Sequence, residues 1–136
     1  MRPSPPRRAA VRAIDTNVLI RFLTADDPAQ AAKARAIFAA GDLFIGVTVL
    51  LEAEWVLRAA YGFAPGAVAD GLRRVAGLPG VAIEDAGAVA EALAAMDGGM
   101  DFADALHLAR AGRCEAFLTF DQRLAKRGGE RVVLAG

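Results

Sequence analysis

Short apolar runs alternate with helical patterns along most of the chain. Five runs suit buried strands and lie at residues 11–14, 43–47, 81–83, 116–119 and 131–134. The segments between them favour helices, at about residues 18–23, 28–40, 48–61, 65–76, 86–96, 101–111 and 121–127. Strands that alternate with helices predict an α/β fold, with a central, mainly parallel sheet and helices on both of its faces.

Several of these helices carry recognisable start and stop signals. Asp27 precedes Pro28, which is a typical N-cap followed by proline in the first helical turn. Gly41 ends the same helix, because glycine readily adopts the backbone conformation of a helix C-terminus. Gly62 ends another helix, and Pro65 begins the next one.

The length and composition indicate one folded domain. The chain has 136 residues, of which 55% are hydrophobic, enough for a single core over residues 11–136. Residues 1–10 carry three prolines and three arginines, so we expect them to form a flexible arm. The sequence shows no internal repeat.

Charge and cysteine content exclude few functions. The 16 basic and 16 acidic residues balance, whereas a protein that wraps duplex DNA is usually basic. The single cysteine, Cys114, cannot form an intrachain disulfide, and its apolar neighbours predict an inert place in the core. No signal peptide or membrane-spanning run is visible, so we expect a cytoplasmic protein without a membrane partner.

Two aspartates follow predicted strands. Asp15 comes directly after the first strand, and Asp121 follows the strand that ends near Thr119. Each taken alone is explained by N-capping of the next helix. However, ligands of parallel sheets gather at the carboxyl ends of the strands, which is where both residues lie.

Glu52 and Glu54 lie on the same predicted helix but differ in their neighbours. The residues three and four positions from Glu52 include no cation, and apolar residues share its side, so we expect Glu52 to face inward. A carboxylate on an apolar face needs a metal, a hydrogen-bond donor or a proton. Glu54 has Arg58 four residues on, which predicts an ordinary exposed ion pair.

Asp101 and Asp104 share one face at the start of a later helix. Asp101 can cap that helix, and Asp104 in the first turn is favoured by the helix dipole. Capping explains Asp101 well. It explains Asp104 less well, because like charges on one face repel each other.

A parallel sheet can bring Asp15, Glu52, Asp104 and Asp121 to one edge. Carboxylates 5 Å apart repel by about 3 kcal/mol per pair at an effective dielectric near 20, so a cation would stabilise such a cluster. Oxygen ligands select Mg²⁺ or Mn²⁺. Such a site suits phosphodiester hydrolysis without a histidine base, and the only histidine, His107, is expected to be structural.

Four blocks of the sequence resemble motifs of the PIN-domain family, in the order in which that family has them. The blocks are IDTNVL at 14–19, LLEAEWVL at 50–57, DFADALHLA at 101–109 and LTFD at 118–121. The second block is similar to that of VapC-like ribonuclease toxins of VapBC toxin–antitoxin systems. The arm at residues 1–10 departs from the family, whose members begin only a few residues before the first aspartate.

The resemblance implies a PIN-like α/β/α sandwich with Mg²⁺- or Mn²⁺-dependent endoribonuclease activity. It implies that Asp15, Glu52, Asp104 and Asp121 are the catalytic and metal-binding residues. Asn17, Thr119 and Asp101 match supporting positions. It further implies a homodimer, RNA as the substrate, and a cognate VapB-like antitoxin whose C-terminal segment covers the active site.

Basic side chains around the acidic edge are candidates to contact phosphates, although most would serve equally well as solvated surface. They are Arg21, Arg110, Arg113, Arg123, Lys126 and Arg127.

Alternative functions remain open at this point. A phosphatase or phosphoryl-acceptor domain would use Asp15 as a nucleophile, but neither needs Glu52 to face inward. A haloacid-dehalogenase-like phosphatase would also have an aspartate where this chain has Asn17. A non-catalytic RNA-binding module on a nuclease-like fold would not need all four acids. A DNA-cleaving relative of flap nucleases would usually be larger.

Overall fold

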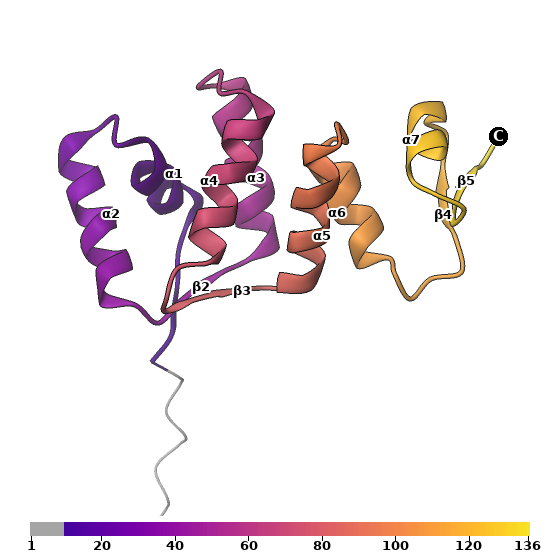
Figure 1. Cartoon of the computed structure of the whole chain (residues 1–136). Coiled ribbons are helices and arrows are strands. Elements are labelled where there is room, and N and C mark those ends of the chain that lie inside the picture. Colours follow the sequence, from indigo (N-terminus) through magenta and orange to yellow (C-terminus); the bar gives the residue numbers. More distant parts are fainter. Residues whose placement is uncertain (1–9) are drawn as a thin grey trace, which may run out of the picture.

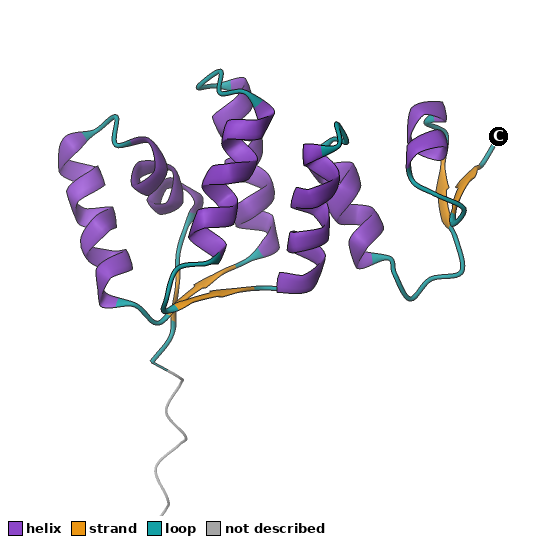
Figure 2. Ribbon diagram, in the orientation of Figure 1, coloured by secondary structure: helices purple, strands orange, loops and turns teal. Residues whose placement is uncertain are grey.

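The computed structural model describes residues 10–136, in which helices alternate with short strands (Figures 1 and 2). The expected arm falls, except for its last residue, outside the described residues. The strands are β1 (Arg12–Ala13), β2 (Leu43–Ile45), β3 (Val81–Ile83), β4 (Phe117–Thr119) and β5 (Val132–Leu134). The helices are α1 (Thr16–Thr24), α2 (Pro28–Ala40), α3 (Val47–Ala59), α4 (Pro65–Ala76), α5 (Ala86–Asp97), α6 (Phe102–Arg110) and α7 (Gln122–Arg127).

The predicted α/β class with parallel strands and packed helices is confirmed. The signals that mark the ends of α2 act as expected. The side chain of Asp27 accepts a hydrogen bond from the backbone N–H of Gln30, and Gly41 follows the helix with a positive φ of 73°. At Gly41 a side chain would be strained, so glycine is the residue that suits this exit.

The five strands form two separate parallel sheets rather than the one sheet that was expected. In the first sheet β2 lies between β1 and β3, and in the second β4 pairs with β5. Figure 1 shows β4, α7 and β5 beyond α6, away from β1. The carboxyl ends of β1 and β4 therefore do not share a sheet edge.

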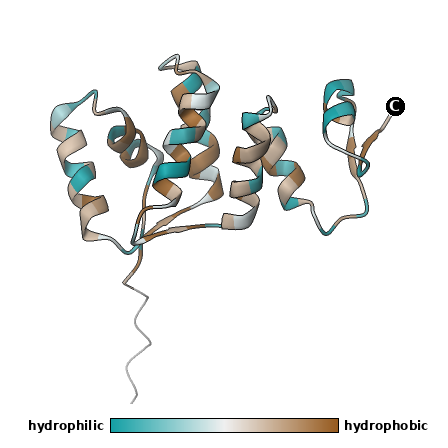
Figure 3. Cartoon of the chain, in the orientation of Figure 1, coloured by the Kyte–Doolittle hydropathy of each residue, from teal (hydrophilic) through white to brown (hydrophobic). Residues whose placement is uncertain are grey.

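The hydrophobic core lies between the first sheet and the helices around it. Leu19, Ile45, Leu50, Leu72 and Phe102 are fully buried members of one cluster. The part from β4 to β5 contributes little to this cluster, and there a mostly hydrophilic α7 stands beside hydrophobic strands (Figure 3).

Cys114 is exposed on the segment between α6 and β4, so its expected place in the core was wrong. The apolar residues near it lie on an irregular segment that does not pack into the main cluster. No helix within residues 10–136 is long and apolar enough to cross a membrane.

Candidate functional site

Three of the predicted carboxylates line one cavity between α6 and α7. This α6–α7 cavity has a volume of about 470 Å³, and its wall includes Asp101, Asp104 and Asp121. Asp101 and Asp104 come from the start of α6, and Asp121 comes from the start of α7. Residues from a helix start and from the end of a strand thus line the same cavity, whereas Asp15 and Glu52 of the predicted set do not line it.

Asp101 fixes the first turn of α6. Its Oδ2 accepts the backbone N–H of Asp104 at 3.2 Å, which is the N-cap interaction expected for it. Asp104 is half-buried, and burial raises the pKa of its carboxyl group above the ordinary value. The negative charges of Asp101 and Asp121 raise that pKa further. Asp104 thus experiences the charge crowding that the sequence predicted.

Asp121 combines a capping role with a place in the cavity. Its Oδ1 accepts the backbone N–H groups of Arg123 at 2.9 Å and Leu124 at 3.2 Å. The hydroxyl oxygen of Thr119 accepts the backbone N–H of Asp121 at 3.0 Å. Both of these N–H groups bond to Oδ1. Within residues 10–136, no hydrogen bond from the protein reaches Oδ2 of Asp121.

Cations share the wall of the same cavity. Arg123, Lys126 and Arg127 lie on α7 and line the cavity together with the acids. Arg127 also donates from Nη1 to the backbone carbonyl of Gly99 at 2.8 Å, which ties α7 to the loop before α6. The cavity therefore offers carboxylates that suit a cation and basic groups that suit an anion such as phosphate.

Other basic candidates have different surroundings. Arg21 donates from Nη1 to Asp26 and to Tyr61, each at 2.9 Å, and it does not line the α6–α7 cavity. The Nε of Arg110 lies 3.4 Å from Asp85.

Asp15 follows β1 and caps α1, and it does not line the α6–α7 cavity. Its Oδ1 accepts the backbone N–H of Thr16 at 2.7 Å at the start of α1. Asn17 is exposed in the first turn of that helix. The structure therefore does not bring Asp15 and Asp121 to one edge, because β1 and β4 belong to different sheets.

The predicted orientation of the two glutamates of α3 was wrong. Glu54 is 2% exposed, whereas Glu52 is exposed and so is Trp55, at 59%. α3 buries Val47, Leu50, Ala53, Glu54 and Leu57, a spacing that defines one face of a helix. α3 is apolar on almost every side, so its hydrophobic pattern does not fix which side faces the core.

The buried Glu54 is satisfied by Arg58, which donates to both carboxylate oxygens. The Nη2–Oε1 distance is 3.1 Å, and Nε bonds to Oε2. The hydrogen bond to Glu54 raises the pKa of Arg58. The i,i+4 ion pair was predicted correctly, but the burial of Glu54 was not. The long side chain of Arg58 allows this burial, because it brings the guanidinium close to solvent while it bonds to the buried carboxylate.

Glu84 is a residue whose role the sequence analysis missed. It follows β3, and its Oε1 accepts the backbone N–H of Val47 at 2.9 Å, at the start of α3. Its place directly after a strand was a usable signal, the same one that drew attention to Asp15 and Asp121.

The donor set fits a hard divalent cation in its chemistry, because carboxylate oxygens are the ligands that Mg²⁺ and Mn²⁺ prefer. The spacing of these carboxylates is a poorer match to a metal site than their chemistry is. Within residues 10–136, no three histidine, cysteine, aspartate or glutamate side chains are close enough together to form a metal cluster. His107 is exposed on α6 and does not line the cavity.

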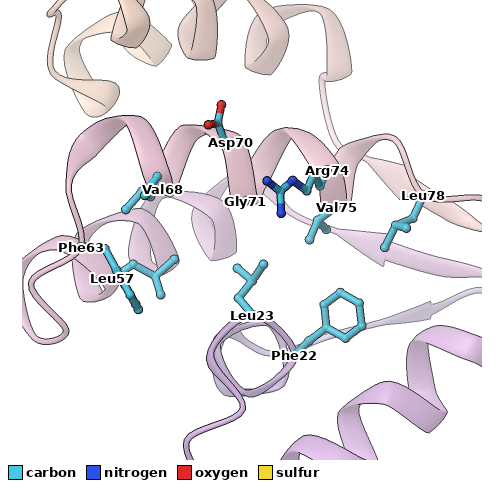
Figure 4. Close-up of a pocket in the computed structure, with 11 residues that line it drawn as sticks. Phe22, Leu23, Leu57, Phe63, Val68, Asp70, Gly71, Arg74, Val75 and Leu78 are labelled. Atoms are coloured by element: carbon cyan, nitrogen blue, oxygen red, sulfur yellow. The ribbon is translucent and has the colours of Figure 1, made fainter.

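A larger cavity of about 580 Å³ lies elsewhere, between α1 and α4 (Figure 4). Phe22, Leu23 and Val75 contribute apolar walls, and Asp70 and Arg74 are its charged residues. None of the predicted catalytic acids lines it. We therefore assign the candidate chemistry to the smaller α6–α7 cavity, where the carboxylates gather.

A parallel α/β fold with aspartates at helix starts and after strands is the setting of a carboxylate-based site. The profile of the PIN domain family matches residues 12–130, which is most of the chain. The chain therefore belongs to the PIN domain family. PIN domains are generally metal-dependent nucleases. A comparison with curated proteins gave no match.

Proposed function

We propose that this protein is a Mg²⁺- or Mn²⁺-dependent endoribonuclease, with Asp15, Glu52, Asp104 and Asp121 as its metal-binding and catalytic residues. The observation that carries the proposal is the α6–α7 cavity. There Asp104 and Asp121 lie beside Asp101, and cations of α7 share the same wall. Asp15 and Glu52 are included because their positions match the family's motifs, and Glu52 is solvent-exposed and available to a ligand.

Each group of residues has a distinct task in this proposal. Asp104 and Asp121 would hold the ion, whose chemistry is to make water more acidic and to neutralise phosphate charge. Arg123, Lys126 and Arg127 would attract and orient the RNA backbone. Asp101 and Thr119 support the acids through hydrogen bonds to the backbone of Asp104 and Asp121.

The test is cleavage of a labelled single-stranded RNA by the purified protein. We expect cleavage with Mg²⁺ or Mn²⁺, loss of cleavage in EDTA, and a loss of at least about 100-fold for Asp121→Asn. The matched control is Asp70→Asn, which removes an exposed aspartate that pairs with Arg73 at 3.0 Å, outside the cavity. Full cleavage in excess chelator would contradict the metal mechanism.

We also propose that the nuclease acts in the cytoplasm as the toxin of a toxin–antitoxin pair, as a homodimer that a cognate VapB-like antitoxin neutralises. The four sequence blocks that resemble PIN-domain motifs support this role, and the second block is similar to that of VapC-like toxins. So do exposed apolar side chains that suit a protein partner, chiefly Phe120 at 82% and Leu118 at 68%.

Expression in bacteria tests the toxin role. We expect the wild-type chain to slow growth, Asp15→Asn to slow it far less, and co-expression of the neighbouring antitoxin gene to restore growth. Equal toxicity of the wild type and Asp15→Asn would show that catalysis at this site is not the cause.

A further inference from the structure

Glu54 is a charged group for which the proposed reaction has no use, yet it is the one fully buried charged side chain within residues 10–136. Its two oxygens accept hydrogen bonds from Nε and Nη2 of Arg58 on the same helix. Burial of a carboxylate is costly unless it is paired, so the pair must be kept for either stability or function.

The pair does not end at Arg58. Nη2 of Arg58 also lies 4.0 Å from Oδ1 of Asp101, on α6. The other oxygen of Asp101 accepts the backbone N–H of Asp104. A continuous series of contacts therefore runs from the buried side of α3 to the turn of α6 that carries Asp104.

We propose that Glu54 is a positioning residue for the carboxylates of the α6–α7 cavity, acting through Arg58 and Asp101. This inference rests on the proposed function. Two hydrogen bonds to Glu54 hold the guanidinium against α3, and its Nη2, which makes one of these bonds, stays 4.0 Å from Oδ1 of Asp101. Asp101 then remains free to cap α6 and to hold the first turn, with Asp104, in place.

Loss of the charge of Glu54 has a defined consequence. Arg58 would lose its main partner, and the nearest other carboxylate that it contacts is Asp101. The guanidinium would move toward Asp101, weaken the cap of α6, and bring positive charge toward the acids. Both effects oppose binding of a divalent cation by these acids.

A purely structural ion pair would behave differently in a double-variant comparison. Glu54→Gln keeps the shape of the side chain but leaves Arg58 with an uncompensated charge. Glu54→Gln combined with Arg58→Gln removes that charge as well. If Glu54 acts by restraining Arg58, the second change restores what the first one disturbs.

The first measurement is titration of the purified protein with Mn²⁺ alone. We expect Glu54→Gln to weaken Mn²⁺ binding about tenfold, the range typical of residues that orient metal ligands. We expect the double variant to return to within about twofold of wild type, and Asp70→Asn, which breaks an exposed ion pair on α4, to bind as wild type. Wild-type affinity in Glu54→Gln, or equal weakness in the double variant, would overturn the proposal.

The second measurement needs no metal. Amide hydrogen exchange at Asp104 in EDTA should be several-fold faster in Glu54→Gln than in wild type, and should return in the double variant. Unchanged exchange would overturn the proposal. If the wild type takes up no Mn²⁺, the proposed function fails, whereas the exchange measurement still decides the role of Glu54.

A second variant covers the case in which Glu54→Gln does not fold. Arg58→Lys keeps the charge but cannot bond to both oxygens in the planar arrangement of a guanidinium. It should accelerate exchange at Asp104 in the same direction, and wild-type exchange in Arg58→Lys would contradict the proposal.

Discussion

At Asp104, burial and two neighbouring carboxylates act in the same direction. Each favours the protonated form, so the pKa is raised above its ordinary value of 3.8 in the folded protein. A raised carboxyl pKa means that the folded state binds the proton more tightly than the unfolded state does. The charge of Asp104 therefore destabilises the fold once the pH is above that pKa.

We predict that Asp104→Asn is more stable than wild type in EDTA at pH 7. The gain should be at most about 1 kcal/mol, because water screens a half-buried group and because an acid in the first turn of α6 is favoured by the helix dipole. The gain should disappear at a pH well below 3.8, where Asp104 is protonated in both the folded and the unfolded state. Thermal unfolding at both pH values tests this. A variant that is clearly less stable at pH 7 would make Asp104 a structural residue of the helix start.

In contrast to Asp104, the buried Glu54 of α3 is expected to stabilise the protein, and the exposed Glu52 of the same helix serves as its control. We predict that Glu54→Ala lowers the free energy of unfolding by about 1–3 kcal/mol, because it leaves Arg58 unpaired and empties a buried position. Arg58 is partly exposed, which keeps the loss below that of a fully buried pair. Glu52→Ala should change stability by less than about 0.5 kcal/mol, as surface substitutions do. Urea denaturation compares the two, and equal losses would contradict the burial of Glu54.

These two glutamates also show where prediction from the sequence failed within the site. Capping by Asp101 and Asp121 was predictable, because a cap depends on a residue and the few residues after it. The side of α3 that faces the core was not, because apolar residues lie on most sides of that helix. Only contacts with distant elements decide that Glu54 is buried and Glu52 exposed.

At the scale of elements, the sequence predicted every helix and strand to within about two residues. Local signals made this possible, such as Asp27 and Pro28 at the start of α2 and Pro65 at the start of α4. The pairing of the strands could not be predicted in the same way. Each strand has only two or three residues, too few to carry a pattern that specifies its neighbour.

Glycines in two helical settings give an element-scale prediction. A Cβ at Gly66, near the start of α4, would meet no atom within 4 Å, whereas a Cβ at Gly128 would clash with the side chain of Val132 and the carbonyl oxygen of Leu124. We predict that Gly66→Ala stabilises the protein by up to about 1 kcal/mol. Gly128→Ala should destabilise it by about 1–3 kcal/mol.

Thermal unfolding of the two alanine variants measures both effects. The Gly66 variant gains because alanine restricts the unfolded chain more than glycine does. The Gly128 variant loses because β5 packs directly against the end of α7. A Gly128→Ala variant as stable as wild type would contradict the close packing of Val132 against the end of α7.

At the scale of the whole molecule, the acids proposed for the metal fall into separate places. Asp104 and Asp121 line the α6–α7 cavity, and Asp15 lies at the end of β1 in the other sheet. We predicted that all four acids lie at one edge because we expected a single sheet. Local patterns reveal strands, but the division into two sheets depends on contacts between distant segments.

Our last prediction tests whether the separate acids bind one ion. A ligand that binds only the folded state at 100 times its dissociation constant stabilises that state by about 2.7 kcal/mol. Mn²⁺ should therefore raise the melting temperature of the wild type, and Asp121→Asn should lose most of that increase. If the ion contacts both parts of the chain, Asp15→Asn loses it as well, while Asp70→Asn keeps it. If Asp15→Asn is stabilised as strongly as wild type, the α6–α7 cavity binds the ion without Asp15, and the metal-binding set must be reduced accordingly.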